Sequence, residues 1–382
     1  MAHKEVVIVG GGPIGLTTAL ILIKNGFKVT VLDNGKSKAG DGRVLALSYA
    51  SVGLLKEYGI WSDELSTAIN EVHISHRGLG VSKIIADELS LDALGYTIRY
   101  SDICDILEKK LSNNHLYESI ITSVDEVMHG QNYATVIYND QNDIKYLTAD
   151  LVILAEGGNI KVPGVIHEFH DYLQTAIIAT IATEVKPRGI AYERFGNDGG
   201  LVLLPYLNDY VLVWSLSNKF LENSSFDQNL LQKKLQDLTF MQRFGNFKVS
   251  DEIHQFPLKL RFTKNRVLDN VILIGNSAQT VHPVSAQGMN LGLRDAKILS
   301  DVILNAKTFK HDTNIFCLKK LREYDTFRNC DTKTVIGFTH YLAKIADSNN
   351  NFMSHLRGAG IIALSNCKLM EDKIANSLIF GN

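Results

Sequence analysis

The sequence has few cysteines, almost no net charge and no long hydrophobic run. Its 382 residues include only Cys104, Cys317, Cys330 and Cys367, none of them in a CxxC pair. We therefore expect buried structural thiols in a reducing compartment, and no metal site. A formal net charge of −2 provides no basic surface, so nucleic acid is not an expected partner.

No segment is apolar over the length that a bilayer requires. The early apolar run Val6–Val9 is broken at once by glycines and lacks the cleavage site of a signal peptide. We expect a cytoplasmic protein, at most peripheral to the inner membrane. A chain of 382 residues with 45% hydrophobic and 21% charged residues is typical of a globular protein of two or three domains.

The N-terminal segment has the pattern of a dinucleotide site. Gly10, Gly12 and Gly15 follow a predicted strand and, with Pro13, open a predicted helix, so the helix N-terminus would face a pyrophosphate. Asp33 ends the next predicted strand, where a carboxylate accepts both hydroxyls of the adenosine ribose. A carboxylate there disfavours a ribose 2′-phosphate, and hence NADP, at this site.

A second such pattern occupies residues 270–297. A β-branched run is followed by the small residues Gly275-Asn276-Ser277-Ala278, by His282-Pro283, and by Gln287-Gly288-Met289-Asn290 at the start of a helical pattern. Amide groups at that helix start would stabilise negative charge on a reduced flavin ring, and Pro283 would form a rigid wall beside it. One dinucleotide held at both ends indicates a flavin enzyme.

Four residues with ionisable side chains have more than one possible role from the sequence alone. Arg43, in the loop Asp41-Gly42-Arg43, could reach phosphate or ribose oxygens or lie solvated in its loop. His282 could act chemically, although a loop histidine before proline more often has a structural role. For Arg294 and Asp295, an intrahelical or surface ion pair is the expected account.

The remaining chain predicts α/β segments that an antiparallel sheet interrupts. We expect helices at Ile14–Asn25, Leu47–Tyr58 and Ser101–Leu111, strands at Lys28–Asp33, Glu71–Ser75 and Leu151–Ala155, an inserted sheet from Thr175–Ala182, Gly189–Arg194, Leu201–Leu204 and Tyr210–Ser215, and mostly helix after about residue 315.

These motifs together resemble the flavoprotein aromatic hydroxylases of the para-hydroxybenzoate hydroxylase fold. Within them the chain is most similar to the ubiquinone-biosynthesis hydroxylases of the UbiH/UbiF/VisC type. The resemblance rests on Gly10–Gly15, on Asp41-Gly42-Arg43 with Ala46-Leu47-Ser48, on the words GNSAQTVHP and QGMNLGLRD, on Ala191–Phe195 with Leu203-Leu204-Pro205, and on Tyr324 with Arg328 and Asp331.

The resemblance implies an α/β fold: a Rossmann-like FAD-binding domain (1–70, 98–165 and 265–330), interrupted by a substrate domain with an antiparallel sheet (71–97 and 166–264), and a helical C-terminal region (331–382). It places Gly10, Gly12 and Gly15 at the pyrophosphate, Asp33 at the ribose, and Arg43 against FAD. It puts position 276 near the ribitol, Pro283 near the flavin ring, and Gly288, Met289 and Asn290 at the ring's pyrimidine edge.

The implied reaction is hydroxylation of a prenylated phenol in ubiquinone biosynthesis, with NAD(P)H as a transient co-substrate and O2 as the oxidant. One oxygen atom enters the ring and the other leaves as water. The residues identify no catalytic side chain, since the oxygen chemistry belongs to the cofactor. Other ubiquinone-biosynthesis proteins are expected as partners.

Two positions depart from the wider family pattern. Asn276 replaces the Asp of most flavin hydroxylases, as it does in the ubiquinone subfamily. Glu156-Gly157-Gly158-Asn159-Ile160 replaces a family motif that has Asp, and it lacks that motif's serine. Three alternatives stay open: a hydroxylase of a small soluble phenol, an FAD-dependent reductase or halogenase, against which the 275–295 motif argues, and a non-catalytic flavoprotein component of a quinone-biosynthesis complex. The altered motif at 156–160 is the only support for the third.

The C-terminal stretch from His355 to Phe380 interleaves apolar residues with Arg357, Lys368 and Lys373. It is either a helix packed on the FAD domain or an apolar surface that contacts a membrane or a partner protein.

Overall fold

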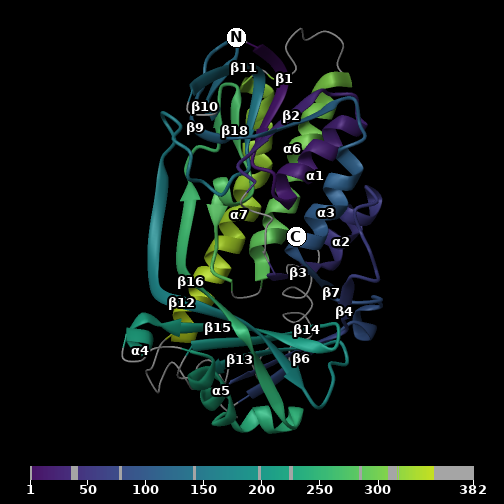
Figure 1. Cartoon of the computed structure of the whole chain (residues 1–382), viewed down its shortest axis with the longest axis vertical. Helices are drawn as coiled ribbons and strands as arrows, with labels where there is room; N and C mark the ends of the chain where they lie inside the picture. Colours follow the sequence, from purple (N-terminus) through teal and green to yellow (C-terminus); the bar gives the residue numbers. More distant parts are fainter. Residues whose placement is uncertain are drawn as a thin grey trace.

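The computed structural model describes residues 2–35, 42–76, 80–140, 143–196, 199–222, 227–283, 286–308, 316 and 318–347. Figure 1 shows an elongated molecule, with the N-terminal strands at one end and a second group of strands at the other. Asp41, Cys317, Cys367 and the stretch from His355 to Phe380 lie outside the described residues.

The first sheet carries the predicted βαβ unit. Its strands follow the order β17-β18-β11-β1-β2-β8, and each neighbouring pair from β18 to β8 is parallel. Their bounds are β1 (Ala2–Val9), β2 (Val29–Asp33), β8 (Tyr117–Ile121), β11 (Asp143–Leu154), β17 (Val267–Leu268) and β18 (Val271–Leu273), with β9 (Ser123–Met128) and β10 (Ala134–Asp140) as an antiparallel extension.

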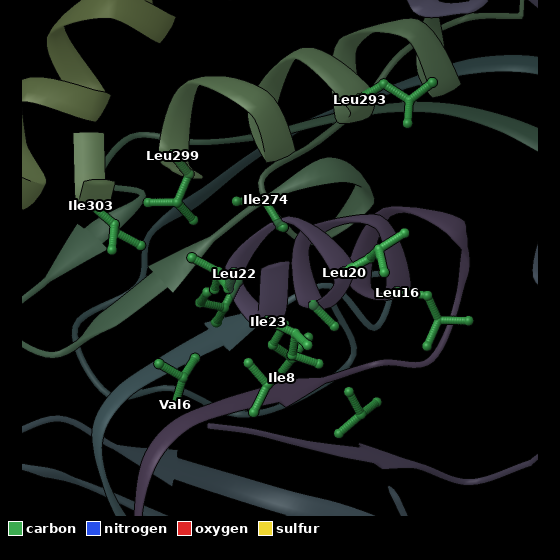
Figure 2. Packing of buried hydrophobic residues seen from close by; sticks show 14 of the residues in the cluster. Val6, Ile8, Leu16, Leu20, Leu22, Ile23, Ile274, Leu293, Leu299 and Ile303 are labelled. Atoms are coloured by element: carbon green, nitrogen blue, oxygen red, sulfur yellow. The ribbon is translucent and has the colours of Figure 1, made fainter. Parts of the chain in front are cut away.

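Helix α1 (Pro13–Lys24) packs between this sheet and α6 (Gln287–Thr308), as Figure 2 shows. Ile8 of β1, Leu16 of α1 and Ile303 of α6 are all fully buried in one cluster. Fully burying each such side chain contributes about 1.5–3 kcal/mol. The packing joins the two nucleotide-type patterns of the sequence in one buried cluster, although about 260 residues separate them.

The second sheet has the order β19-β16-β12-β15-β14-β13-β5-β6. Two 17-residue strands, β12 and β16, run along one side of the molecule between its two ends (Figure 1). The bounds are β5 (Glu71–His76), β6 (Gly80–Ile85), β12 (His167–Thr183), β13 (Ile190–Gly196), β14 (Gly199–Tyr206), β15 (Asp209–Ser217), β16 (Phe247–Thr263) and β19 (Gln279–Thr280).

One face of this sheet packs on α5 (Gln228–Gln236) and η2 (Thr239–Phe244) through a buried apolar cluster that includes Leu231 and Leu235. Short elements α4 (Asn218–Glu222) and η1 (Asp87–Leu89) lie at its margins. The expected antiparallel sheet is therefore present, but it is larger than predicted. Strands β16 and β19 extend it at one edge, and β5 and β6 extend it at the other, where β5 joins β13 in parallel.

A small third sheet, β3-β7-β4, is formed by β3 (Val44–Ser48), β7 (Gly95–Arg99) and β4 (Ser66–Ile69). The predicted helix Leu47–Tyr58 is wrong at its start: α2 spans Tyr49–Glu57. Leu47 and Ser48 pair with β7 instead, and the Ser48 hydroxyl caps the helix by accepting from the Ser51 amide. Helix α3 (Tyr100–Leu111) agrees with prediction.

The chain after residue 315 is helical as far as it is described, in the single helix α7 (Leu318–Asp347). Cys104 is buried as predicted, but Cys330 on α7 is exposed, so the expectation of buried thiols is wrong there. Within the described ranges, no helix combines the length and apolarity needed to cross a membrane.

We retain the predicted domain boundaries as a proposal. The sheets support it, because β5 and β6 from residues 71–97 join the strands of residues 166–264 in one sheet. The segments on either side, β1–β2 and β8–β11, join β18 in the other sheet. Strand β7 of the third sheet (Gly95–Arg99) crosses the proposed boundary between residues 97 and 98.

Candidate functional site

A cavity of about 910 Å³ opens at the carboxyl ends of the parallel strands β1, β2, β11 and β18. Ligands of doubly wound folds bind at this edge of the sheet. The cavity extends from there past the third sheet to the second sheet, whose side chains form its far wall. Of the predicted site residues, these line it: Gly10, Gly12, Pro13, Asp33, Arg43, Asn276, Pro283, Gln287, Gly288, Met289 and Asn290.

The glycine turn at the start of α1 has no room for side chains. Gly10 has φ +112°, and a Cβ there would lie 2.6 Å from the carbonyl carbon of Ala155. Gly15 lies behind the cavity, where a Cβ would lie 2.0 Å from the Gly10 oxygen. Gly12 caps α1 without a side-chain bond, so the first amides of the helix stay available for an anion.

Asp33 lies beside this turn, at the end of β2. Its Oδ1 accepts from the Gly11 amide (3.0 Å) and its Oδ2 accepts from the Gly35 amide (3.0 Å). A carboxylate offers about four lone-pair sites, so both oxygens keep capacity for further donors such as a ribose diol. The two amide bonds hold the carboxylate in place at the cavity wall.

Arg43 lines the cavity, which favours the cofactor interpretation over a solvated loop. Its guanidinium lies 5.1 Å from the ring centroid of Tyr100 and 5.6 Å from that of Phe256. Cation–π contacts of this kind hold an arginine in position at the cavity wall.

The loop that follows β18, residues 275–283 (the late loop), is held from behind by a buried carboxylate. Asp295 of α6 is fully buried, and its Oδ2 accepts from the Gly275 amide (2.9 Å) and from the Gln279 side chain (2.6 Å). Its Oδ1 accepts from Nε of the equally buried Arg328 of α7 (2.6 Å).

The expected intrahelical or surface pair between Arg294 and Asp295 is therefore wrong. Arg294 instead pairs with Asp331 of α7 at 3.1 Å between Nε and Oδ2. Adjacent residues of a helix point in different directions, so each reaches its own partner on α7.

The first turn of α6 borders the cavity with Gln287, Gly288, Met289 and Asn290. The Asn290 side chain is engaged with β3: its Oδ1 accepts from the Ser48 amide (2.9 Å), and its Nδ2 donates to the Ala46 carbonyl (3.3 Å). These two bonds connect Ala46-Leu47-Ser48 to the first turn of α6, although more than 240 residues separate them. The first turn of a helix has backbone amides without intrahelical partners, and these amides could donate hydrogen bonds to a ring bound in the cavity.

His282 fits the structural interpretation. It is buried, its Nε2 lies 3.1 Å from Gln174 Oε1, and its ring packs edge-on against Tyr172 at 4.9 Å between centroids. Burial lowers the pKa of His282 to about 4, so the ring is neutral at pH 7.

The altered motif at Glu156 forms a closed network. The Glu156 carboxylate accepts from the amides of Gly158 and Asn159, both at 2.8 Å, and from the Ser277 hydroxyl at 3.0 Å. Arg261 donates to the carbonyls of Gly158 (2.6 Å), Gly157 and Asn276, which ties this loop to the late loop. Ser277 and Arg261 thus fix a loop whose own serine is missing.

Three residues of the site were not predicted: Tyr100, Arg261 and Glu193. Tyr100 and Arg261 act through the tertiary fold, and no local pattern marks them. Glu193 lies within the quoted motif Ala191–Phe195, but beside Arg194 in the strand it has no pattern that marks it as a cavity residue. Burial raises the pKa of its carboxyl to about 7. No group of His, Cys, Asp or Glu that could hold a metal ion occurs among the residues described.

Comparison with known proteins agrees with this geometry. A family model described as FAD binding domain matches residues 3–308. The chain is 28% identical over 326 residues to the 3-demethoxyubiquinol 3-hydroxylase of Escherichia coli, covering 80% of this chain and 81% of that protein. It is 26% identical to the ubiquinone hydroxylase UbiM of Neisseria meningitidis, covering 98% and 84%.

Among solved structures, p-nitrophenol 4-monooxygenase from Pseudomonas putida superposes with a TM-score of 0.81 at 16% identity, covering 99% of each chain. That identity supports a shared fold. The expected α/β fold with an interrupted nucleotide-binding domain is confirmed by this likeness.

Proposed function

Since this chain belongs to the FAD binding domain family, whose model matches residues 3–308, we propose that it is an FAD-dependent monooxygenase that hydroxylates a prenylated phenol in ubiquinone biosynthesis. NAD(P)H and O2 are its co-substrates. Relatives named as ubiquinone hydroxylases support this reaction. The observation that carries the proposal is one continuous cavity, which joins the glycine turn of α1 to an apolar sheet face.

The residues of the cavity fit FAD. Gly10 and Gly12 form a cradle that a Cβ would fill, and α1 begins there without a side-chain cap. Bound FAD supplies the reducible ring that NAD(P)H reduces and that activates O2. We assign the pyrophosphate to the turn at Gly12 and Pro13, and the adenosine ribose to Asp33.

The rest of the chain would orient the ring and exclude water. We assign Arg43 and Asn276 to the middle of the cofactor, Pro283 to the side of the ring, and the amides of Gln287–Asn290 to its pyrimidine edge. The dipole of the 22-residue helix α6 favours negative charge at that edge.

Two alternatives lose support. An apolar far wall, with Val72, Ile74, Val202 and Val213, suits a substrate with a hydrocarbon tail better than a small soluble phenol. A non-catalytic flavoprotein rested only on the altered Glu156 loop, and that loop has its own hydrogen-bond network. We therefore favour the enzyme.

The direct test is oxygen incorporation. Purified flavoprotein with 2-(3-methylbut-2-enyl)phenol, NADH or NADPH, and ¹⁸O₂ should give a product with one labelled oxygen on the ring, detected by mass spectrometry. The two reductants compared identify the preferred nicotinamide, and the product identifies the ring carbon. Reductant oxidation without labelled product would contradict the proposal.

Asp33→Ala should weaken FAD binding by about 1.5–3 kcal/mol, the usual loss of a hydrogen bond to a charged group. The dissociation constant is measured by flavin fluorescence quenching on apoprotein. Asp33→Asn keeps an acceptor for the Gly11 amide, so its dissociation constant for FAD should lie between those of the wild type and Asp33→Ala. An unchanged constant for Asp33→Ala would remove it from the site.

A prenylated substrate partitions into lipid, so we also propose peripheral contact with a membrane or a partner protein, through the stretch from His355 to Phe380. Truncation after about residue 352 should then leave FAD bound and abolish flotation with lipid vesicles. A flavin-free or insoluble truncated chain would make that stretch ordinary core.

A further inference from the structure

One carboxyl group interrupts the apolar far wall of the cavity. Glu193 lies in the middle of β13, where it pairs with Val202 of β14 and with Ile74 of β5. The same row continues through Val213 and Ile178. All five residues of this row line the cavity, and Glu193 is its only polar member.

The neighbours of Glu193 in its own strand point the other way. Tyr192 packs against His73, Tyr210 and Phe244, and the Arg194 guanidinium lies 4.2 Å from the ring centroid of Phe240. These contacts belong to the opposite face of the sheet. The arginine therefore does not neutralise the carboxylate beside it in sequence.

Glu193 has no partner for one of its oxygens within the described part of the chain. Its Oε1 is buried and accepts no hydrogen bond there. The residue is partly exposed, and it lines the cavity. The other charged residues that line the cavity are Asp33, Arg43 and Glu156, and none of them contributes to the pKa shift of Glu193. An unpaired buried carboxyl costs stability, which a ligand that donates a hydrogen bond would offset.

We propose that Glu193 recognises the ring hydroxyl of the phenol, accepting its O–H hydrogen bond while the apolar row around it contacts the ring and tail. This assignment rests on the proposed function and adds a substrate-binding residue to it. It also orients the substrate, because the hydroxyl is held at the second sheet and the rest of the ring extends toward the dinucleotide end of the cavity.

The assignment predicts that binding is linked to a proton. Burial alone raises the pKa of Glu193 to about 7, so near neutral pH part of the population is a neutral acid. The phenol O–H binds the carboxylate more strongly than the acid, so binding moves a proton from the acid to the buffer. Phenol affinity should therefore rise as pH increases through 7.

The experiment is calorimetry on the flavin-loaded protein with 2-(3-methylbut-2-enyl)phenol and, as the matched ligand, its methyl ether. Titrations at pH 7 in two buffers of different ionisation enthalpy measure the protons released. For the phenol we expect a fractional proton release, and an affinity about 5–10-fold higher at pH 8 than at pH 6, the difference between a charge-assisted and a neutral hydrogen bond. The ether should show neither effect.

Glu193→Gln should abolish the proton release and the pH dependence, and should weaken the phenol about 10-fold at pH 8 while leaving the ether unchanged. Glu193→Asp should retain proton release with weaker binding, and flavin absorbance verifies that each variant is folded. Glu88→Gln, an exposed acid of the short helix η1, is the matched control and should behave as wild type.

The outcomes separate the two proposals. Wild-type binding of the phenol with no proton release, or full phenol affinity in folded Glu193→Gln, would overturn the role of Glu193 and leave the hydroxylase function standing. Failure of the wild-type protein to bind either ligand would overturn both.

Discussion

Replacement of Gly12 by valine should yield a folded protein that purifies without FAD. A Cβ at residue 12 would lie 2.8 Å from the Tyr100 hydroxyl, and the branched side chain would occupy the space that we assign to the pyrophosphate. Overpacking of about 1–3 kcal/mol adds to the lost amide–phosphate bonds, so FAD affinity should fall about 100-fold or more. Visible flavin absorbance of the purified protein measures it.

Gly53→Val is the matched control, because Gly53 lies exposed on α2 and a Cβ there meets nothing within 4 Å. It should retain full flavin. Full absorbance in Gly12→Val would show that Gly10–Gly15 is not the dinucleotide site.

A second variant separates the two causes of the defect. Tyr100→Phe in the Gly12→Val background removes the hydroxyl but leaves the valine in the path of the pyrophosphate. Flavin should therefore remain absent. Its recovery would assign the defect to crowding against Tyr100 and would take the phosphate out of the explanation.

The nucleotide half of the fold could be predicted because its signals are local. The glycines of the first turn are needed by backbone geometry, as the positive φ of Gly10 and the contact of Gly15 with the Gly10 oxygen show. The βαβ period and the late loop are likewise written in contiguous residues. Each of these patterns specifies its local structure without contacts from the rest of the chain.

The prediction failed where a distant partner decides the local structure. Leu47 and Ser48 have a helical pattern, but pairing with β7 and the bond from Ser48 to Asn290 make them a strand. Arg294 and Asp295 are adjacent in sequence, and only the position of α7 gives them different partners, the part-buried Asp331 and the fully buried Arg328. A contact between residues more than 30 positions apart cannot be recognised in a short window of the sequence.

The substrate end of the site was the least predictable part. Its wall is assembled from β5, β13, β14, β15 and β12, and the row that holds Glu193 exists only through the register of those strands. From sequence alone, an acid in a strand is most simply placed on the solvent face. The position of Glu193 on the cavity wall follows from this register, which no local sequence pattern specifies.

The largest stability loss should follow from Asp295→Asn. Asp295 and Arg328 are both fully buried, and their charge-assisted contact at 2.6 Å joins α6 to α7. An amide keeps the shape but removes one of the two carboxylates that pair with the Arg328 guanidinium, which leaves Asp331 as its partner. Breaking one side of a buried pair costs up to about 3–5 kcal/mol. Because Asp295 also accepts from the Gly275 amide, the late loop should loosen and FAD should bind more weakly.

Urea unfolding of the flavin-loaded protein, followed by flavin release and circular dichroism, measures the change. Asp301→Asn is the control on the same helix, since Asp301 pairs with Lys297 at 2.7 Å but its side chain is 43% exposed. A partly exposed pair of that kind contributes less than about 1 kcal/mol. Equal losses in the two variants would show that burial of the Asp295 pair has no special effect.

The double variant Asp295→Leu/Arg328→Met tests the reason. Replacing both partners of a buried ion pair by apolar residues removes the uncompensated charge, so it should be more stable than Asp295→Asn. In that background Asp331 keeps Arg294 as its partner, and the buried Arg266, which also lies 3.9 Å from Asp295, keeps Asp325 at 3.3 Å. Recovery should nevertheless be partial, because the Gly275 amide and the Gln279 side chain still lose their acceptor. A double variant no more stable than Asp295→Asn would mean that these loop contacts, and not the buried charge, account for the whole loss.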